Sequence, residues 1–154
     1  NTTTLGINKA VAIARYISKS AMSEVKSYAV RISDANVYDL IRDCDLVIDA
    51  LDNVETRFEL ERACEVRSIP LITGGVTHWY GQISTIFPGD RSMEKIYGKM
   101  QSQEEPPVLA FTACNIASCQ VAEAVRTLLG RPGLRHKLLV IDLYDFTAKI
   151  LPLE

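Results

Sequence analysis

The sequence has 154 residues, 47% of them hydrophobic and 23% charged, as in a folded globular chain rather than a disordered one. Seventeen basic and nineteen acidic residues give a net charge of −2, which excludes the basic profile of a non-specific nucleic-acid binder. No apolar run approaches the roughly 20 residues that cross a bilayer, so we expect no membrane attachment. The four cysteines form no C-x-x-C pair, which favours a reducing cytoplasm.

The elements expected in the first half of the chain begin with a helix. Apolar residues three or four apart predict this helix over residues 7–18, and alternation predicts a strand over residues 25–32. A short helix is expected over residues 37–42. Leu46, Val47 and Ile48 form a compact apolar run between aspartates, typical of a parallel strand covered on both faces.

The second half continues the alternation and then becomes rich in strands. Asp52 or Asn53 can cap a helix that runs to about Arg67. The remaining expected elements are a strand over residues 71–73 ended by Gly74-Gly75, a strand over 80–87, a surface loop over 90–107, a helix over 112–129, and a hairpin of strands 137–143 and 146–151. This order predicts an α/β fold with a parallel sheet, an antiparallel edge and one core.

The segment from Asp43 to Asn53 contains the most informative chemistry. A buried strand leads directly into acidic residues and the start of a helix, and ligands of open α/β sheets bind beyond the carboxyl ends of the strands. Asp52 there could bind a divalent cation, because hard cations prefer carboxylate oxygens. Alternatively, Asp52 caps the helix. We expect Asp49 to hold backbone at the end of the strand.

Several motifs occur together in a fixed order along the chain. They are the Gly6-x-x-Lys9-Ala10 opening, Asp45-Leu-Val-Ile-Asp-Ala-Leu-Asp-Asn53 followed by Arg57, Ile69-Pro-Leu-Ile leading to Gly74-Gly-Val, Gly81-Gln-Ile, Phe87-Pro-Gly, and Gln120-Val-Ala-Glu-Ala. This set resembles the ThiF/MoeB/HesA family over essentially residues 1–154. The resemblance implies a Rossmann-like adenylation domain with a mostly parallel sheet and helices on both faces. Family members use ATP and Mg²⁺ to activate the C-terminal glycine of a small ubiquitin-like or sulfur-carrier protein.

The resemblance assigns roles to four residues. Lys9 matches the family lysine that contacts nucleotide phosphates, although a solvated lysine at a helix end is the alternative. Asp52 matches the aspartate associated with Mg²⁺ and adenylation. Asn53 and Arg57 lie in the same motif and would shape the cofactor pocket; helix capping and a surface ion pair are their alternatives.

The sequence also departs from the family pattern. The family's glycine-rich nucleotide loop belongs to a βαβ unit that would precede Asn1, so we expect a piece of a longer protein that is inactive by itself. The positions of the family's zinc ligands, near 93–100, contain no cysteine, so we predict no zinc site. The stretch 101–108, where some relatives keep a reactive cysteine, contains none; we expect Cys114 and Cys119 to pack inside their helix.

Three functions compete at this point. The first is an ATP-dependent adenylyltransferase that acts on a carrier with a Gly-Gly end and works as a cytoplasmic homodimer. The second is a non-catalytic family member that serves as a dimeric or carrier-binding scaffold. The third is an NAD-dependent oxidoreductase domain, for which the sequence offers no acid or base for hydride transfer. An intact glycine-rich loop upstream would favour the first, and a degraded loop the second.

Overall fold

The computed structural model describes residues 4–98 and 107–153, which form two compact units. The first unit comprises residues 1–32 and the second residues 33–154. All the buried residues of the described chain belong to the second unit, so the single core expected from the length lies there.

The described part of the first unit contains the α-helix α1 (Lys9–Ile17), close to the predicted range. Asn8 caps it by accepting a hydrogen bond from the Ala10 N–H at 2.9 Å. The strand predicted over residues 25–32 is wrong, because this segment has no regular secondary structure. The alternating pattern is present, but no second strand in the described part of this unit offers the backbone hydrogen bonds that a strand needs.

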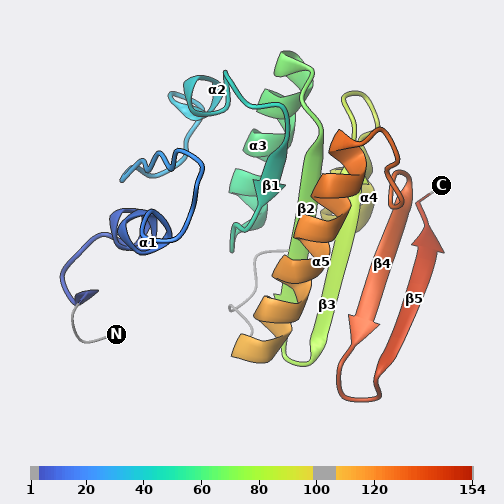
Figure 1. Cartoon of the computed structure of the whole chain (residues 1–154). Helices are drawn as coiled ribbons and strands as arrows, with labels where there is room; N and C mark the ends of the chain where they lie inside the picture. Colours follow the sequence, from blue (N-terminus) through green and yellow to red (C-terminus); the bar gives the residue numbers. More distant parts are fainter. Residues whose placement is uncertain (1–3, 99–106, 154) are drawn as a thin grey trace. The chain divides into compact units, whose positions relative to one another are not determined.

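The second unit contains a five-stranded sheet in the order β1-β2-β3-β4-β5 (Figure 1). The strands are β1 (Val47–Asp49), β2 (Leu71–Thr77), β3 (Tyr80–Ile86), β4 (Lys137–Asp142) and β5 (Thr147–Pro152). β1 and β2 are parallel, as expected of two strands joined through a helix, and the other three pairings are antiparallel. The mixed α/β fold with an antiparallel edge is confirmed, and the antiparallel part is the larger one.

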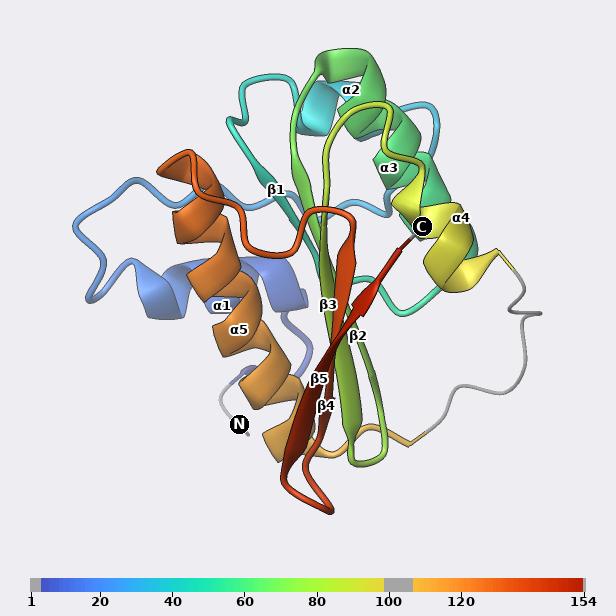
Figure 2. The same cartoon turned by 90° about the vertical axis from the view of Figure 1, so that its right-hand side faces the viewer.

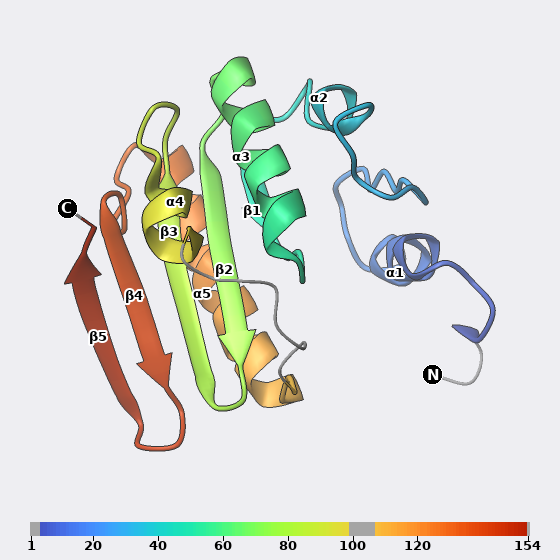
Figure 3. The ribbon, with the colours of Figure 1, turned by 180° about the vertical axis from the view of Figure 1, so that it is seen from behind.

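Helices cover both faces of this sheet. Figures 1 and 3 show α5 (Ala110–Leu128) on one face and α3 (Val54–Arg67) with α4 (Ser92–Tyr97) on the other, and Figure 2 shows the same layers from the side. The short α2 (Val37–Leu40) contacts α3. The main core cluster joins sheet and α5 residues, namely Ile72, Ile83, Ile116, Ala124 and Leu134. Within the described residues, no helix is long and apolar enough to span a membrane.

Two glycines let α5 lie close to the sheet. A β-carbon at Gly74 would be 2.5 Å from the Gln120 side chain, and one at Gly81 would be 2.2 Å from Ile116. β2 therefore continues through Gly74 and Gly75, and the prediction that these glycines end the strand is wrong. The absence of side chains here serves close packing rather than a turn.

Two further predictions need correction. The surface loop predicted over 90–107 contains α4, whose Met93 and Tyr97 are buried on the face of the sheet that α3 also covers. Residues 99–106 lie outside the described part. The full burial expected of the first parallel strand is also wrong, because Ile48 is 42% exposed. The helices over 52–67 and 112–129 and the closing hairpin are confirmed.

Candidate functional site

A buried polar network joins the carboxyl end of β1 to Thr73 and Gly74 in the middle of the neighbouring strand β2. Asp49, the last residue of β1, lies 2.5 Å from the guanidinium of Arg57 near the start of α3, and both side chains are buried. The Thr73 hydroxyl donates to the same carboxylate oxygen at 2.8 Å, and the Leu51 N–H donates to the other at 2.8 Å. Asp49 thus holds the backbone beyond β1, as the sequence predicts.

The guanidinium of Arg57 forms several hydrogen bonds within this network. Beyond Asp49, it donates to the Gly74 carbonyl at 2.7 Å and to the Leu51 carbonyl, and it lies 5.1 Å from the centre of the Tyr97 ring. A buried charge requires such compensation. Arg57 therefore ties β1, β2, α3 and α4 together; its predicted role in cofactor binding stays a prediction.

Burial raises the pKa of the Asp49 carboxyl, while the Arg57 charge and the hydrogen bonds from Leu51 and Thr73 act in the opposite direction. Gln120 of α5 completes the network by donating to the Asp49 carbonyl at 2.8 Å and to the Ile72 carbonyl at 3.3 Å. The site thus receives support from α5 on one face of the sheet and from α3 on the other.

Asn53 and Asp52 separate into different roles at the start of α3. The Asn53 side chain caps the helix by accepting from the Thr56 N–H at 2.8 Å. Asp52 is exposed, and its carboxylate has no hydrogen bond or ion pair within the residues that the structure describes. The capping alternative for Asp52 is therefore wrong, and this carboxylate is available to a ligand at the carboxyl end of β1.

An exposed carboxylate at this position suits Mg²⁺. Protein sites usually hold this ion through one or two carboxylates, with substrate phosphates and water as the other ligands. In the described part of the chain, no group of three or more His, Cys, Asp and Glu side chains is arranged to hold a metal by itself. A cation at Asp52 would need further oxygen ligands from a bound nucleotide.

Lys9 is an exposed residue at the first position of α1, in the first unit. Its ammonium group forms no ion pair among the described residues, so it too is available to a ligand. Its position is described within its own unit, and its predicted contact with nucleotide phosphates stays a prediction.

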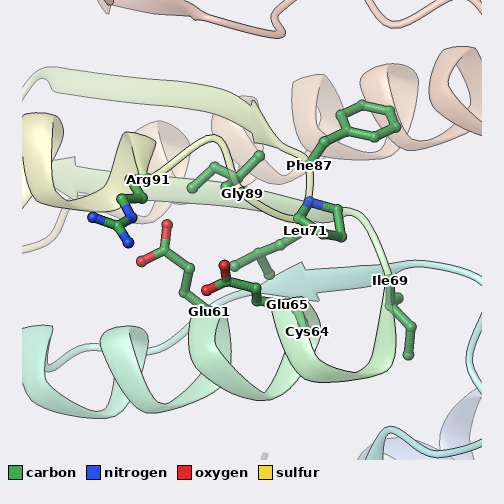
Figure 4. Close-up of a pocket in the computed structure, with 10 residues that line it drawn as sticks. Glu61, Cys64, Glu65, Ile69, Leu71, Phe87, Gly89 and Arg91 are labelled. Carbon is green, nitrogen blue, oxygen red and sulfur yellow. The ribbon is translucent and has the colours of Figure 1, made fainter.

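Two cavities of the second unit lie away from this network. One of about 30 Å³, enough for water only, lies between α3 and the loop after β3; Figure 4 shows the Arg91 guanidinium beside the Glu61 carboxylate at its edge. A wider groove of about 440 Å³ lies between α3 and α4. Glu61, Glu65 and Glu94 line it with one compensating arginine, Arg91, so its charge disfavours phosphate groups.

The cysteines differ from one another in exposure. Cys64 is buried in α3, and burial raises the pKa of its thiol to about 12. Cys119 is half-buried, whereas Cys114 is exposed, which corrects the expectation that it packs inside the helix. The residues of α5 that face the sheet lie on the other side, at Thr112, Ile116 and Gln120.

Sequence reasoning missed two members of the network. Thr73 lies in an expected strand, and a threonine in a strand does not by itself indicate a hydrogen bond to a buried carboxylate. Tyr97, which accepts from Arg57 at 3.3 Å, lies in a segment whose composition predicts a loop, and only the helical spacing of Met93 and Tyr97 could have indicated burial.

The geometry describes an α/β protein with a structured polar junction at the carboxyl end of the parallel strand β1, and folds of this class bind ligands beyond the carboxyl ends of their parallel strands. The sequence pattern of the ThiF family matches residues 1–154, and the chain belongs to this family. It is 35% identical over 151 residues to the adenylyltransferase and sulfurtransferase MOCS3 of Dictyostelium discoideum, covering 89% of this chain and 35% of that protein.

Two further similarities agree with this family. The sulfur carrier protein adenylyltransferase of Thermus thermophilus is 29% identical over 143 residues, with coverage of 84% of this chain and 53% of that protein. The crystal structure of Escherichia coli MccB with ATP has a TM-score of 0.71 at 16% identity, covers 99% of this chain and 50% of the other, and supports the fold. The chain thus spans a third to a half of the length of these proteins.

Proposed function

We propose that the full-length protein adenylates the C-terminal glycine of a small ubiquitin-like or sulfur-carrier protein, with ATP and Mg²⁺ as cofactors. The proposal includes a Gly-Gly carrier end and a cytoplasmic homodimer. It is supported by membership of the ThiF family and by the adenylyltransferase names of the relatives from Dictyostelium and Thermus. The crystal structure of MccB with ATP, a protein of the same fold, supports the same nucleotide.

The reaction joins a carboxylate to AMP. A carboxylate oxygen of the carrier attacks the α-phosphorus of ATP and forms a new O–P bond, while the bond from this phosphorus to the bridging oxygen breaks and releases pyrophosphate. The step needs close positioning and compensation of the phosphate charge, and it needs no nucleophile from the protein. Cys114 and Cys119 therefore have no part in the adenylation step.

The main support for this proposal is that the Asp52 carboxylate is exposed and free to bind a ligand. Asp49 is committed to Arg57 and Asn53 to the helix cap, so Asp52 is the acidic group at the carboxyl end of β1 that, among the described residues, is free to hold Mg²⁺ with the phosphates. When bound, Mg²⁺ would compensate phosphate charge. Lys9 would contact the phosphates, and Asn53 and Arg57 would keep the turn after β1 in place around the cofactor.

The test is ATP–pyrophosphate exchange by the full-length protein in the presence of a Gly-Gly carrier. We expect Asp52→Ala to lower the exchange rate roughly 100-fold or more, because one preorganised electrostatic contact is worth about this much. The control is Asp43→Ala, which removes an aspartate whose side chain is 88% exposed. Exchange that is equal in both variants, or absent from the wild type, would reject the proposal.

A further inference from the structure

An exposed aromatic cluster lies at the end of the sheet where the β2–β3 turn and the β4–β5 turn meet the start of α5. Figures 1 and 2 show these three segments side by side at the lower end of the sheet. The centre of the Trp79 ring lies 4.9 Å from that of Phe111 and 5.5 Å from that of Tyr144. Phe146 follows in the same turn as Tyr144. We name these four residues the aromatic platform.

Hydrogen bonds to backbone carbonyls fix the three segments that carry the platform. The Leu143 N–H donates to the Trp79 carbonyl at 3.0 Å, which joins the two turns. The Thr112 hydroxyl donates to the His78 carbonyl at 2.8 Å, which joins the β2–β3 turn to α5. Rings that are held in this way have little conformational freedom left to lose on binding, which favours affinity.

The platform leaves much of its aromatic surface exposed. Trp79, Phe111, Tyr144 and Phe146 are 39, 48, 68 and 88% exposed. Together they present roughly 500 Å², the size of surface patches that often mark interaction sites. Phe146 also has a positive φ of 53°, a conformation that suits glycine or asparagine. A bulky residue so exposed gains little from packing within the chain, so we attribute its presence to binding.

The charges beside the platform are negative. Asp142 accepts from the Tyr144 N–H at 2.8 Å, which places its carboxylate against the β4–β5 turn, and Asp145 is an exposed residue of this turn. Neither carboxylate forms an ion pair within the described residues. The Asp142 charge is the largest cause of the raised pKa of the neighbouring Tyr80 phenol, and the Asp145 charge adds to it. No lysine or arginine occurs in the segments that form this end, residues 76–80, 107–113 and 142–148.

We propose that the aromatic platform docks an arginine-bearing segment of another protein. The planar guanidinium of arginine stacks on aromatic rings and also pairs with carboxylates, so one side chain matches both features of this surface. Tryptophan, tyrosine and arginine are also the residues that contribute most to binding at protein interfaces. An anionic membrane surface would instead meet Asp142 and Asp145 with charge of the same sign. The inference goes beyond the proposed adenylation and does not rest on it.

The test is binding of a fluorescein-labelled peptide, Arg-Leu-Arg-Leu-Arg, to the full-length protein by fluorescence polarisation, with Glu-Leu-Glu-Leu-Glu as the comparison peptide. We expect only the arginine peptide to bind, and to bind more weakly as the salt concentration rises. Tyr144→Ser and Asp145→Lys should each weaken its binding roughly 10-fold. The matched controls are Tyr28→Ser, which changes a 57% exposed tyrosine of the first unit, and Glu94→Lys, which changes an exposed glutamate of α4. Both controls should bind the peptide as the wild type does.

A wild type that does not bind the arginine peptide, or that binds both peptides equally, would overturn the inference. Equal effects of the platform variants and their controls would overturn it too. Circular dichroism shows whether each variant is folded, and if Tyr144→Ser unfolds, Asp145→Lys decides. Binding to vesicles of phosphatidylcholine and phosphatidylserine that Tyr144→Ser abolishes, without peptide binding, would assign the platform to a membrane instead. Loss of an oligomer in Tyr144→Ser, again without peptide binding, would assign it to a second copy.

Discussion

Arg57 reaches back eight positions to Asp49, and its guanidinium lies 2.5 Å from the carboxylate inside the protein. Removal of one partner would leave the other charged and unpaired. We expect Arg57→Met to destabilise the fold by about 3–5 kcal/mol, and Asp49→Asn combined with Arg57→Met to cost less than the sum of the single changes. Urea unfolding of the four proteins measures this coupling. Strict additivity would contradict the interpretation of a mutually dependent pair.

The second prediction concerns the space above Gly74. A β-carbon there would lie 2.5 Å from the Gln120 side chain, which is buried and held by two backbone carbonyls. We expect Gly74→Ala to destabilise the protein by about 1–3 kcal/mol, as overpacking of a tight interior does. Adding Gln120→Ala removes the obstruction, so the double variant should lose less than the two single changes together. Thermal or urea unfolding provides the measurement.

The third prediction is a pH dependence at Glu61. Burial raises the pKa of this carboxyl, the charges of Glu65 and Glu94 add to the increase, and the Met93 N–H opposes it. A carboxyl whose pKa is raised on folding favours the folded state below its ordinary pKa, and this contribution is lost as the pH rises through the folded value.

Glu61→Gln should therefore raise the melting temperature at neutral pH, since its amide oxygen can still accept from Met93, and the gain should disappear toward about pH 4. Glu55→Gln serves as the control, because Glu55 is an exposed residue of α3 whose charge is not among those that raise the pKa of Glu61. A gain of equal size at both pH values would contradict the role of ionisation.

The fourth prediction concerns thiol reactivity. The thiolate is the reactive form, and the Cys64 thiol, buried with a pKa of about 12, holds almost none of it at about pH 8. We expect iodoacetamide to label Cys44 and Cys114 quickly in the native protein and Cys64 only after unfolding. Mass spectrometry of digested protein locates the label. Rapid native labelling of Cys64 would show that α3 opens readily at this point.

The elements that sequence reasoning predicted well have local signals. α3 has an asparagine cap, and α5 has a long apolar spacing ended by Gly130, which adopts a positive φ of 72°. The hairpin of β4 and β5 follows from two apolar runs around a short turn. These features lie within a few residues of one another, so the sequence alone predicts them.

The elements that it missed depend on distant partners. Residues 25–32 have the alternation of a strand and no pairing strand in the described part of their unit, while Gly74-Gly75 continues β2 because α5 lies close above it. The availability of Asp52 was likewise undecidable, since either Asp52 or Asn53 could cap α3. For Asp49, the contact with backbone was predicted, whereas its contacts with Arg57 and Thr73, which lie 8 and 24 positions away in the sequence, were not.

The hydrogen bond from Gln120 to the Asp49 carbonyl spans 71 positions of sequence. Synthesis proceeds from the N-terminus, so β1, α3 and β2 leave the ribosome before this amide does. Until then the Asp49 carbonyl lacks its partner and the space above Gly74 is empty. The junction next to the turn that carries Asp52 is therefore completed late, and a nascent chain can form it only after α5 has emerged and docked.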